Sequence, residues 1–293
     1  ANIVCRMSPE KGIYFGKAVS LGNECDLNSA DFLTYYAEDD ETKVIGAYIE
    51  GICNSRYFLS ALKETASRKP VIIWKVGLTS EGSKAASSHT GALASTPEIW
   101  DGVIQQTGAI PAVGFENWVD LLMGFTHFPP GLGERTAIIS GPGGLAVSAA
   151  EACGHAGLKL AELSPETIDN LSKFVPLTGT SLKNPIDVGM SASLDIDIYI
   201  QSARIAAEDP NIDAVFMIGI GFSNEDNTRL AEALIQTRRE LNKPIAMINV
   251  PGFDRNLAQL LCESSVPFFE SAERAMSTYS AVRNYQQWKD RVE

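Results

Sequence analysis

The stretch Lys69-Pro-Val-Ile-Ile-Trp-Lys75 decides the fold class of this chain, because a second stretch, Lys243-Pro-Ile-Ala-Met-Ile-Asn249, repeats its pattern. Each is a short apolar run that begins at Lys-Pro, a pattern typical of a buried strand. Each is followed by another proline-containing run and a Phe-Glu pair, at Ile110-Pro111 and at Val266-Pro267. Apolar runs alternate with amphipathic segments in both halves, which predicts parallel sheets with helices on both faces. We therefore expect one α/β unit used twice.

The same alternation predicts the individual elements. The expected helices begin at residues whose side chains accept hydrogen bonds from free helix amides, such as Asn54 and Thr96. We expect strands at residues 2–5, 17–21, 44–50, 70–76, 110–113, 136–140, 213–221, 244–250 and 266–269. We expect helices at residues 28–36, 54–67, 96–107, 115–125, 143–154, 165–174, 195–207, 226–241, 256–263 and 272–288.

The length of 293 residues suggests two domains, at roughly 150 residues for each. The run Phe128-Pro-Pro-Gly-Leu-Gly133 cannot continue a helix, so we place the boundary there. The predicted domains are residues 1–127 and 128–293. The chain begins with Ala1 rather than Met, so we expect it to be a piece of a longer protein.

Composition excludes several classes of protein. The formal net charge of −12 argues against a nucleic-acid partner, which needs a basic surface. No apolar run approaches the roughly 18 residues of a membrane span, so we expect no membrane partner. The five cysteines are scattered and show no CxxC spacing, which argues against a disulfide framework or a zinc site. We expect a cytoplasmic protein without a metal site of its own.

The first half carries an insertion after the first of the two repeated strands. Pro70 and Pro111 are separated by 41 residues, whereas Pro244 and Pro267 are separated by 23, so about 18 extra residues fall around 77–95. Because these residues are small and polar, we expect a mobile, exposed loop, and such loops are more often functional than idle. The loop follows the carboxyl end of a strand, which is the edge where open α/β sheets bind ligands.

His89 lies in this insertion, between Ser87-Ser88 and Thr90-Gly91. A neutral imidazole nitrogen can attack a phosphoryl group when its other nitrogen is held by a carboxylate or carbonyl, and small neighbours leave room for the donor. Position alone is equally compatible with a solvated loop histidine. His127 and His155 end predicted helices, and we expect both to be structural or solvent-facing.

Two further features could complete a phosphoryl site. Glu50 closes the apolar run 44–49 at the ligand edge of the first sheet, with a plain strand-end residue facing water as the alternative. Glu24 and Asp26 are weaker candidates for the same role. The segment Ser140-Gly-Pro-Gly-Gly144 links a strand to a helix, and its glycines and free amides suit an anion. A tight turn without a ligand is the alternative there.

Together these segments resemble the NDP-forming acyl-CoA synthetases, the superfamily of succinyl-CoA synthetase and ADP-forming acetyl-CoA synthetase. The resemblance covers nearly the whole chain. It runs, in this order, through Val19-Ser-Leu-Gly-Asn23, Ser87-Ser-His-Thr-Gly91, Ser140-Gly-Pro-Gly-Gly144 and Asn184-Pro-Ile-Asp187. It implies two flavodoxin-like, that is Rossmann-like, α/β domains, each a parallel sheet between two layers of helices.

The resemblance also implies a reaction. Acyl-CoA, phosphate and ADP are interconverted with a carboxylic acid, CoA and ATP through an acyl phosphate and a covalent phosphate on histidine. His89 matches the phosphohistidine, and Glu50 matches the glutamate that holds it. Ser140, Gly141, Gly143 and Gly144 match a phosphate-binding helix start, and Ser88, Thr90 and Gly91 would shape the loop.

Other parts of the family have no match in this chain. A CoA-binding Rossmann domain would precede residue 1, and an ATP-grasp domain would bind ATP or ADP with Mg²⁺. We expect both in the same protein or in a partner subunit, and we expect an oligomer. The family's first phosphate turn, Ser-x-Ser-Gly after the opening strand, has no counterpart after Cys5.

Two rival hypotheses remain open, and the missing turn supports the first of them. The chain could be a non-catalytic or regulatory scaffold that retains the fold and binds an anion or a partner. It could also be a phosphohistidine carrier that does not use CoA.

Overall fold

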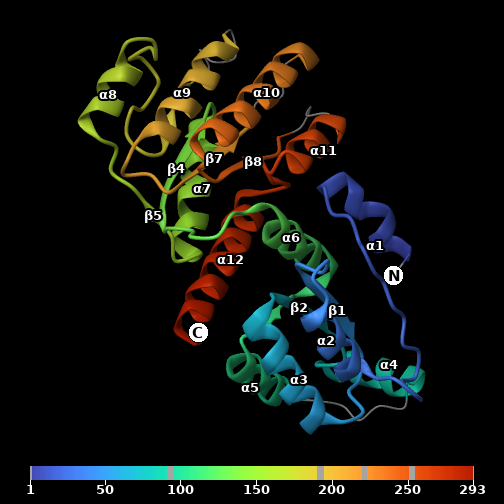
Figure 1. Cartoon of the computed structure of the whole chain (residues 1–293). Helices are drawn as coiled ribbons and strands as arrows, with labels where there is room; N and C mark the ends of the chain where they lie inside the picture. The colour runs from blue at the N-terminus through green and yellow to red at the C-terminus, as the bar shows by residue number, and fades with distance from the viewer. Residues whose placement is uncertain (1, 91–95, 190–194, 220–222, 251–254, 293) are drawn as a thin grey trace. The chain divides into compact units, whose positions relative to one another are not determined.

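The computed structural model describes residues 2–90, 96–189, 195–219, 223–250 and 255–292 (Figure 1). The chain forms two compact units. Unit 1 comprises residues 1–6, 14–126 and 284–293, and unit 2 comprises residues 7–13 and 127–283. Each unit therefore takes in a segment that is remote from the rest of it along the chain.

Unit 1 is built on a parallel sheet of three strands in the order β1-β2-β3. The strands are β1 (Ile45–Ile49), β2 (Val71–Lys75) and β3 (Ile110–Pro111). The helices are α1 (Asn2–Met7), α2 (Ser29–Glu38), α3 (Ser55–Arg68), α4 (Ser80–Thr90), α5 (Pro97–Thr107), α6 (Gly114–His127) and the end of α12 (Ala272–Val292).

Helices cover both faces of this sheet. On one face Phe58 and Leu62 of α3 pack in a buried core with Ile73 of β2 and Trp100 of α5. On the other face α6 lies so close that a Cβ on Gly46 would come within 2.9 Å of Leu122. The α3 helix forms where the sequence predicts it, because the Asn54 side chain accepts a hydrogen bond from the Tyr57 amide.

Unit 2 is built on a parallel sheet in the order β5-β4-β7-β8-β9, with β6 also paired to β4. The strands are β4 (Arg135–Ser140), β5 (Lys159–Leu160), β6 (Ile186–Asp187), β7 (Ala214–Ile218), β8 (Ile245–Ile248) and β9 (Phe268–Phe269). The helices are the 3-10 helix η1 (Ser8–Lys11), α7 (Gly143–His155), α8 (Pro165–Ser172), α9 (Ile196–Glu208), α10 (Asn224–Leu241), α11 (Arg255–Glu263) and the first part of α12.

When the two-residue β6 is left aside, the strands of unit 2 in chain order are β4, β5, β7, β8 and β9. They lie in the sheet as 2-1-3-4-5, which is the flavodoxin-like order. Every residue of β7 and β8 is buried, as expected for strands covered on both faces. Helices α9 and α10 run side by side along this sheet (Figure 1). The predicted fold class, two α/β units with parallel sheets, is confirmed.

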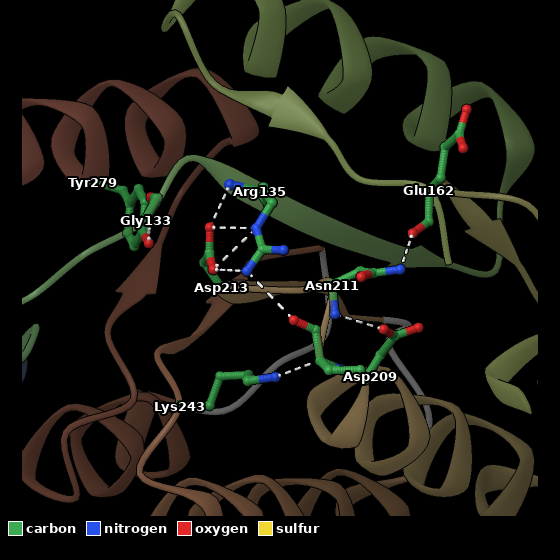
Figure 2. A network of polar contacts seen from close by, with 9 residues as sticks. Gly133, Arg135, Glu162, Asp209, Asn211, Asp213, Lys243 and Tyr279 are labelled. Atoms are coloured by element: carbon green, nitrogen blue, oxygen red, sulfur yellow. Dashed lines mark hydrogen bonds and ion pairs between the residues drawn. The ribbon is translucent and has the colours of Figure 1, made fainter. Parts of the chain in front are cut away.

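The amino edge of the unit 2 sheet is held by internal polar contacts (Figure 2). The Arg135 guanidinium donates to Asp213 Oδ1 at 2.7 Å, and the Arg135 amide donates to Asp213 Oδ2 at 2.9 Å. The Tyr279 hydroxyl donates to the Gly133 carbonyl at 3.0 Å, and Lys243 Nζ donates to the Asp209 carbonyl at 2.8 Å. These groups satisfy one another, so these contacts serve structure. Open α/β sheets bind ligands at the opposite, carboxyl edge.

Three local predictions are wrong. Residues 2–5 lie in helix α1 rather than in a strand, because four apolar residues cannot distinguish the two. Residues 17–21 form no strand; they are mostly exposed and pair with no described strand. The segment 77–95 is not simply a loop, because it contains α4. The short strands β5 and β6 were not predicted, since two residues carry no periodicity.

All five cysteines are free thiols. No described helix combines the length and the apolar character that crossing a bilayer would require.

Candidate active site

The carboxyl ends of β1 and β2 bring two charged residues together in unit 1. Ile49 and Lys75 are partners in the parallel ladder, and Glu50 is the next residue after β1. The chain leaves β2 through Gly77, whose φ of 80° is in the left-handed region that favours glycine, and enters α4 at Ser80. Glu50, Lys75 and the start of α4 therefore share one edge of the sheet.

Glu50, a half-buried residue, accepts a hydrogen bond from a side chain of β1. The Tyr48 hydroxyl donates to Glu50 Oε1 at 3.2 Å. Burial, and then the negative charge of Glu50, raise the pKa of Tyr48, so the hydroxyl keeps its proton and donates it. The sequence analysis did not select Tyr48. The available signal was its position two residues before Glu50, because residues two apart along a strand point to the same face.

Lys75 is a buried residue, only 7% exposed, that carries a positive charge. Its Nζ donates to the Glu50 carbonyl at 2.8 Å and also to the Val76 carbonyl. Burial lowers the pKa of Lys75, and the charge of Glu50 partly opposes that shift. Lysine is almost never buried without partners, so this position is a candidate for function. The sequence signal, a charge that ends an apolar strand, is the one that selected Glu50.

His89 lies in the last turn of α4, which ends at Thr90. Thr79 precedes the helix, and its side chain accepts a hydrogen bond from the Gly82 amide in the first turn at 3.0 Å. Alanine, lysine and glutamate among its residues favour helix, and these outweigh the serines that suggested a loop. Gly91 lies outside the described residues, as do the side chains of Ser88, His89 and Thr90.

The weaker carboxylate candidates and the two other histidines lie elsewhere, and three of these four residues have contacts within the protein. Glu24 Oε1 accepts from the Ser29 amide at the start of α2, at 3.2 Å. His127 is buried, with Nε2 placed 2.9 Å from the Lys11 carbonyl, and burial lowers its pKa. His155 is exposed and pairs with Glu151 at 3.2 Å. Asp26 is exposed.

The glycine-rich turn of unit 2 lies at the topological switch point of its sheet. Ser140 ends β4, which pairs with β7 on one side and with β5 and β6 on the other, so the strand order reverses there. Ligands of open α/β sheets bind in the crevice at such a point. Helix α7 starts at Gly143 after Pro142, and no side chain caps its amides among the described residues. Its start therefore suits an anion.

Two side chains shape this turn from outside the predicted motif. The buried Ser140 Oγ donates to the Pro142 carbonyl at 2.9 Å, which folds the turn back on itself. Asp187, at the end of β6, accepts from the Gly189 amide at 2.8 Å through Oδ1. Its Oδ2 lies 2.7 Å from where a Cβ on Gly143 would be, so any other residue at that position would force the carboxylate to shift. The sequence analysis included Asp187 in the motif Asn184-Pro-Ile-Asp187. It contained no signal that this residue would lie against Gly143.

No group of three or more histidine, cysteine, aspartate or glutamate side chains in the described part of the chain is arranged to hold a metal ion. Both predicted phosphate-handling elements lie at carboxyl edges of parallel sheets, one in each unit.

Comparison with known proteins gives the family. A succinyl-CoA ligase-like flavodoxin domain matches residues 1–125, and a ligase-CoA domain matches residues 136–231. The chain is 35% identical over 280 residues to acetate–CoA ligase [ADP-forming] II subunit alpha of Pyrococcus furiosus, covering 94% of this chain and 60% of the relative. This chain belongs to the NDP-forming acyl-CoA synthetase family.

Other relatives are also similar to nearly the whole of this chain. A 4-hydroxybutyrate–CoA ligase [ADP-forming] of Nitrosopumilus maritimus is 29% identical over 282 residues, covering 95% of this chain and 40% of the relative. The Ca. Korarchaeum cryptofilum dinucleotide forming acetyl-coenzyme A synthetase 1, in complex with phosphate and ADP, superposes with a TM-score of 0.82 at 27% identity. That match covers 96% of this chain and 61% of the synthetase chain. The chain thus spans less than two thirds of these relatives.

Proposed function

We propose that this chain is the part of an NDP-forming acyl-CoA synthetase that carries the phosphohistidine and receives the acyl phosphate. The observation that carries the proposal is in unit 1, where α4, with Ser-Ser-His-Thr in its last turn, follows β2 beside the strand end that holds Glu50. The ligase names of relatives that match 94% or more of the chain do not favour a non-catalytic scaffold.

The proposed chemistry is a transfer between phosphorus and nitrogen. An imidazole nitrogen of His89 attacks the phosphorus of an acyl phosphate, the N–P bond forms, and the P–O bond to the acyl group breaks. The carboxylate leaves, and the phosphoryl group passes from His89 to ADP. Glu50 holds the other imidazole nitrogen and stabilises the positive charge that develops on the ring.

The glycine turn of unit 2 has the complementary task. The amides at the start of α7, including those of Gly143 and Gly144, would bind phosphoryl oxygens as negative charge shifts among them. Ser140 holds the shape of the turn through its bond to Pro142. Ser88, Thr90 and Gly91 would leave room around the imidazole.

The remaining substrates need other parts of the protein. CoA would bind to a Rossmann domain, and ATP or ADP with Mg²⁺ to an ATP-grasp domain, in the same chain or in a partner subunit of an oligomer. We also infer a cytoplasmic location, because CoA, ATP and ADP are cytoplasmic metabolites.

The test is a labelling experiment on the intact protein with all its domains and subunits. Radiolabelled acyl phosphate should produce a phosphoprotein that is labile in acid and stable in base. His89→Ala should abolish the label, whereas His155→Ala, which changes an exposed histidine of α7, should retain it. Glu50→Gln should slow labelling at least about tenfold. A label that persists in His89→Ala contradicts the assignment.

A second labelling experiment separates the synthetase from a carrier that does not use CoA. Radiolabelled inorganic phosphate should label His89 only when acyl-CoA is present, because the thioester must first give an acyl phosphate. Labelling from acyl phosphate without any labelling from acyl-CoA plus phosphate would favour the carrier.

A further inference from the structure

The two lysines of the repeated stretch in unit 1 have different counterparts in unit 2. Each stretch begins its pairing with the neighbouring strand of its own sheet in the same way. The Ile45 amide donates to the Pro70 carbonyl at 3.0 Å, and the Val215 amide donates to the Pro244 carbonyl at 3.0 Å. Lys69 corresponds to Lys243, and Lys75 corresponds to Asn249. Comparison of the two units can therefore distinguish a lysine that the shared fold requires from a lysine that is present only in unit 1.

The first lysine makes the same contact in both units. Lys69 Nζ donates to the carbonyl of Asp39, the C-cap residue that follows α2, at 2.6 Å. Lys243 Nζ donates to the carbonyl of Asp209, the C-cap residue that follows α9, at 2.8 Å. Each lysine satisfies a carbonyl at a helix end, which explains its presence in both units.

The second lysine has no such counterpart. Asn249 directly follows β8, the equivalent strand, and its neutral amide donates to Glu270 Oε2 at 2.6 Å. The same strand end is thus built without a charge, so the fold does not require a cation there. Burying the Lys75 ammonium costs free energy that the neutral residue avoids. A buried charge that the fold does not need calls for an explanation in the chemistry of unit 1.

The contacts of Lys75 supply that explanation. Two of its three N–H donors go to the carbonyls of Glu50 and Val76, the first residues beyond β1 and β2. Glu50 is the residue proposed to hold the imidazole, and Val76 begins the link to the helix that carries His89. One ammonium therefore ties together the backbone of both halves of the proposed phosphohistidine site.

We propose that Lys75 is a positioning residue for phosphoryl transfer, which holds the Glu50 backbone and the chain leading into α4 at a fixed separation. This inference rests on the proposed function. Its positive charge also lies near Glu50, where an arriving phosphoryl group adds negative charge. A displacement of about 1 Å in such a site can lower the rate about 100-fold. Loss of the Lys75 hydrogen bonds should therefore lower the rate constant of phosphoryl transfer.

The test compares Lys75→Asn, the residue that unit 2 uses at this position, with Lys69→Met in the intact protein. Transfer from radiolabelled acetyl phosphate is followed under single-turnover conditions, and thermal unfolding is recorded for each variant. Lys75→Asn should lower the transfer rate constant at least about tenfold, with little change in the acetyl phosphate concentration needed for half-maximal rate. Lys69→Met should lower the unfolding temperature but leave the rate constant within about twofold.

The decisive measurement repeats Lys75→Asn in a Glu50→Gln background. Because Lys75 is proposed to act through Glu50, the second substitution should add little once Glu50 no longer carries a carboxylate. An equal loss in both backgrounds, or an equal loss in Lys69→Met, would show a purely structural role and overturn the inference. Normal labelling of His89 in Lys75→Asn would also overturn it while leaving the proposed function intact. Absence of any label on His89 in the unsubstituted protein would overturn both.

Discussion

The carboxylate of Asp187 lies directly against Gly143, so that a Cβ added to this glycine would be 2.7 Å from Asp187 Oδ2. Moving the carboxylate away would strain or break its other hydrogen bond, which Oδ1 accepts from the Gly189 amide at 2.8 Å. Of the two neighbouring glycines at the start of α7, Gly143 is therefore the one constrained by packing, since nothing lies within 4 Å of a Cβ added to Gly144.

Gly143→Ala should therefore destabilise unit 2 by about 1–3 kcal/mol through overpacking. Gly144→Ala is the matched control, and it should be neutral or stabilising by at most about 1 kcal/mol, because alanine is the better helix former. Urea unfolding followed by circular dichroism measures both. Equal effects of the two substitutions would contradict the contact with Asp187.

Asp213→Asn should reduce stability at neutral pH and remove part of its acid dependence. Burial alone would raise the pKa of Asp213, but hydrogen bonds from the Arg135 side chain and backbone outweigh burial and lower it. A carboxyl with a lowered pKa contributes stability above its unfolded value of about 3.9, and this contribution is lost as the pH falls. The stability difference between the unsubstituted protein and Asp213→Asn should shrink as the pH falls from 6 towards 3. A difference that stays constant over that range would contradict the ion pair in Figure 2.

His127→Gln should make stability less dependent on pH between pH 7 and 5. Burial lowers the pKa of His127, and the bond to the Lys11 carbonyl only partly opposes this. Below the unfolded pKa of about 6.5 the unfolded chain takes up a proton that the folded chain does not, so stability falls with decreasing pH. Unfolding midpoints between pH 7 and 5 should fall less in His127→Gln.

Gly108→Ala should destabilise unit 1, and Trp288→Ala should partly rescue it. Gly108 has a φ of 73°, and a Cβ there would lie 2.2 Å from the Trp288 ring. The left-handed backbone alone costs about 1–2 kcal/mol for alanine, and the clash adds to it. In a double-mutant cycle the two substitutions should be strongly non-additive, because shortening Trp288 removes the clash but not the backbone cost. Additive effects would place the end of α12 elsewhere.

The local sequence was sufficient for the elements whose signals are local. The caps at Asn54 and Thr96 are confirmed, because each side chain bonds an amide within three residues of itself. The repeated Lys-Pro strands are confirmed as β2 and β8. The same local reasoning failed for residues 2–5 and for α4, where short or small side chains carry no decisive periodicity.

The sequence by itself determined the α/β class, the repeated unit, the family and the identity of His89, Glu50 and the glycine turn as candidates, because each depends on residue type and order along the chain. Tertiary structure alone decided that β4 lies beside β7 and so places the turn at a switch point. It also decided that Lys75 is buried on the carbonyl of Glu50 and that Asp187 abuts Gly143. These are contacts between residues 25 to 44 positions apart, and such pairings depend on strand order and register, which no local pattern encodes.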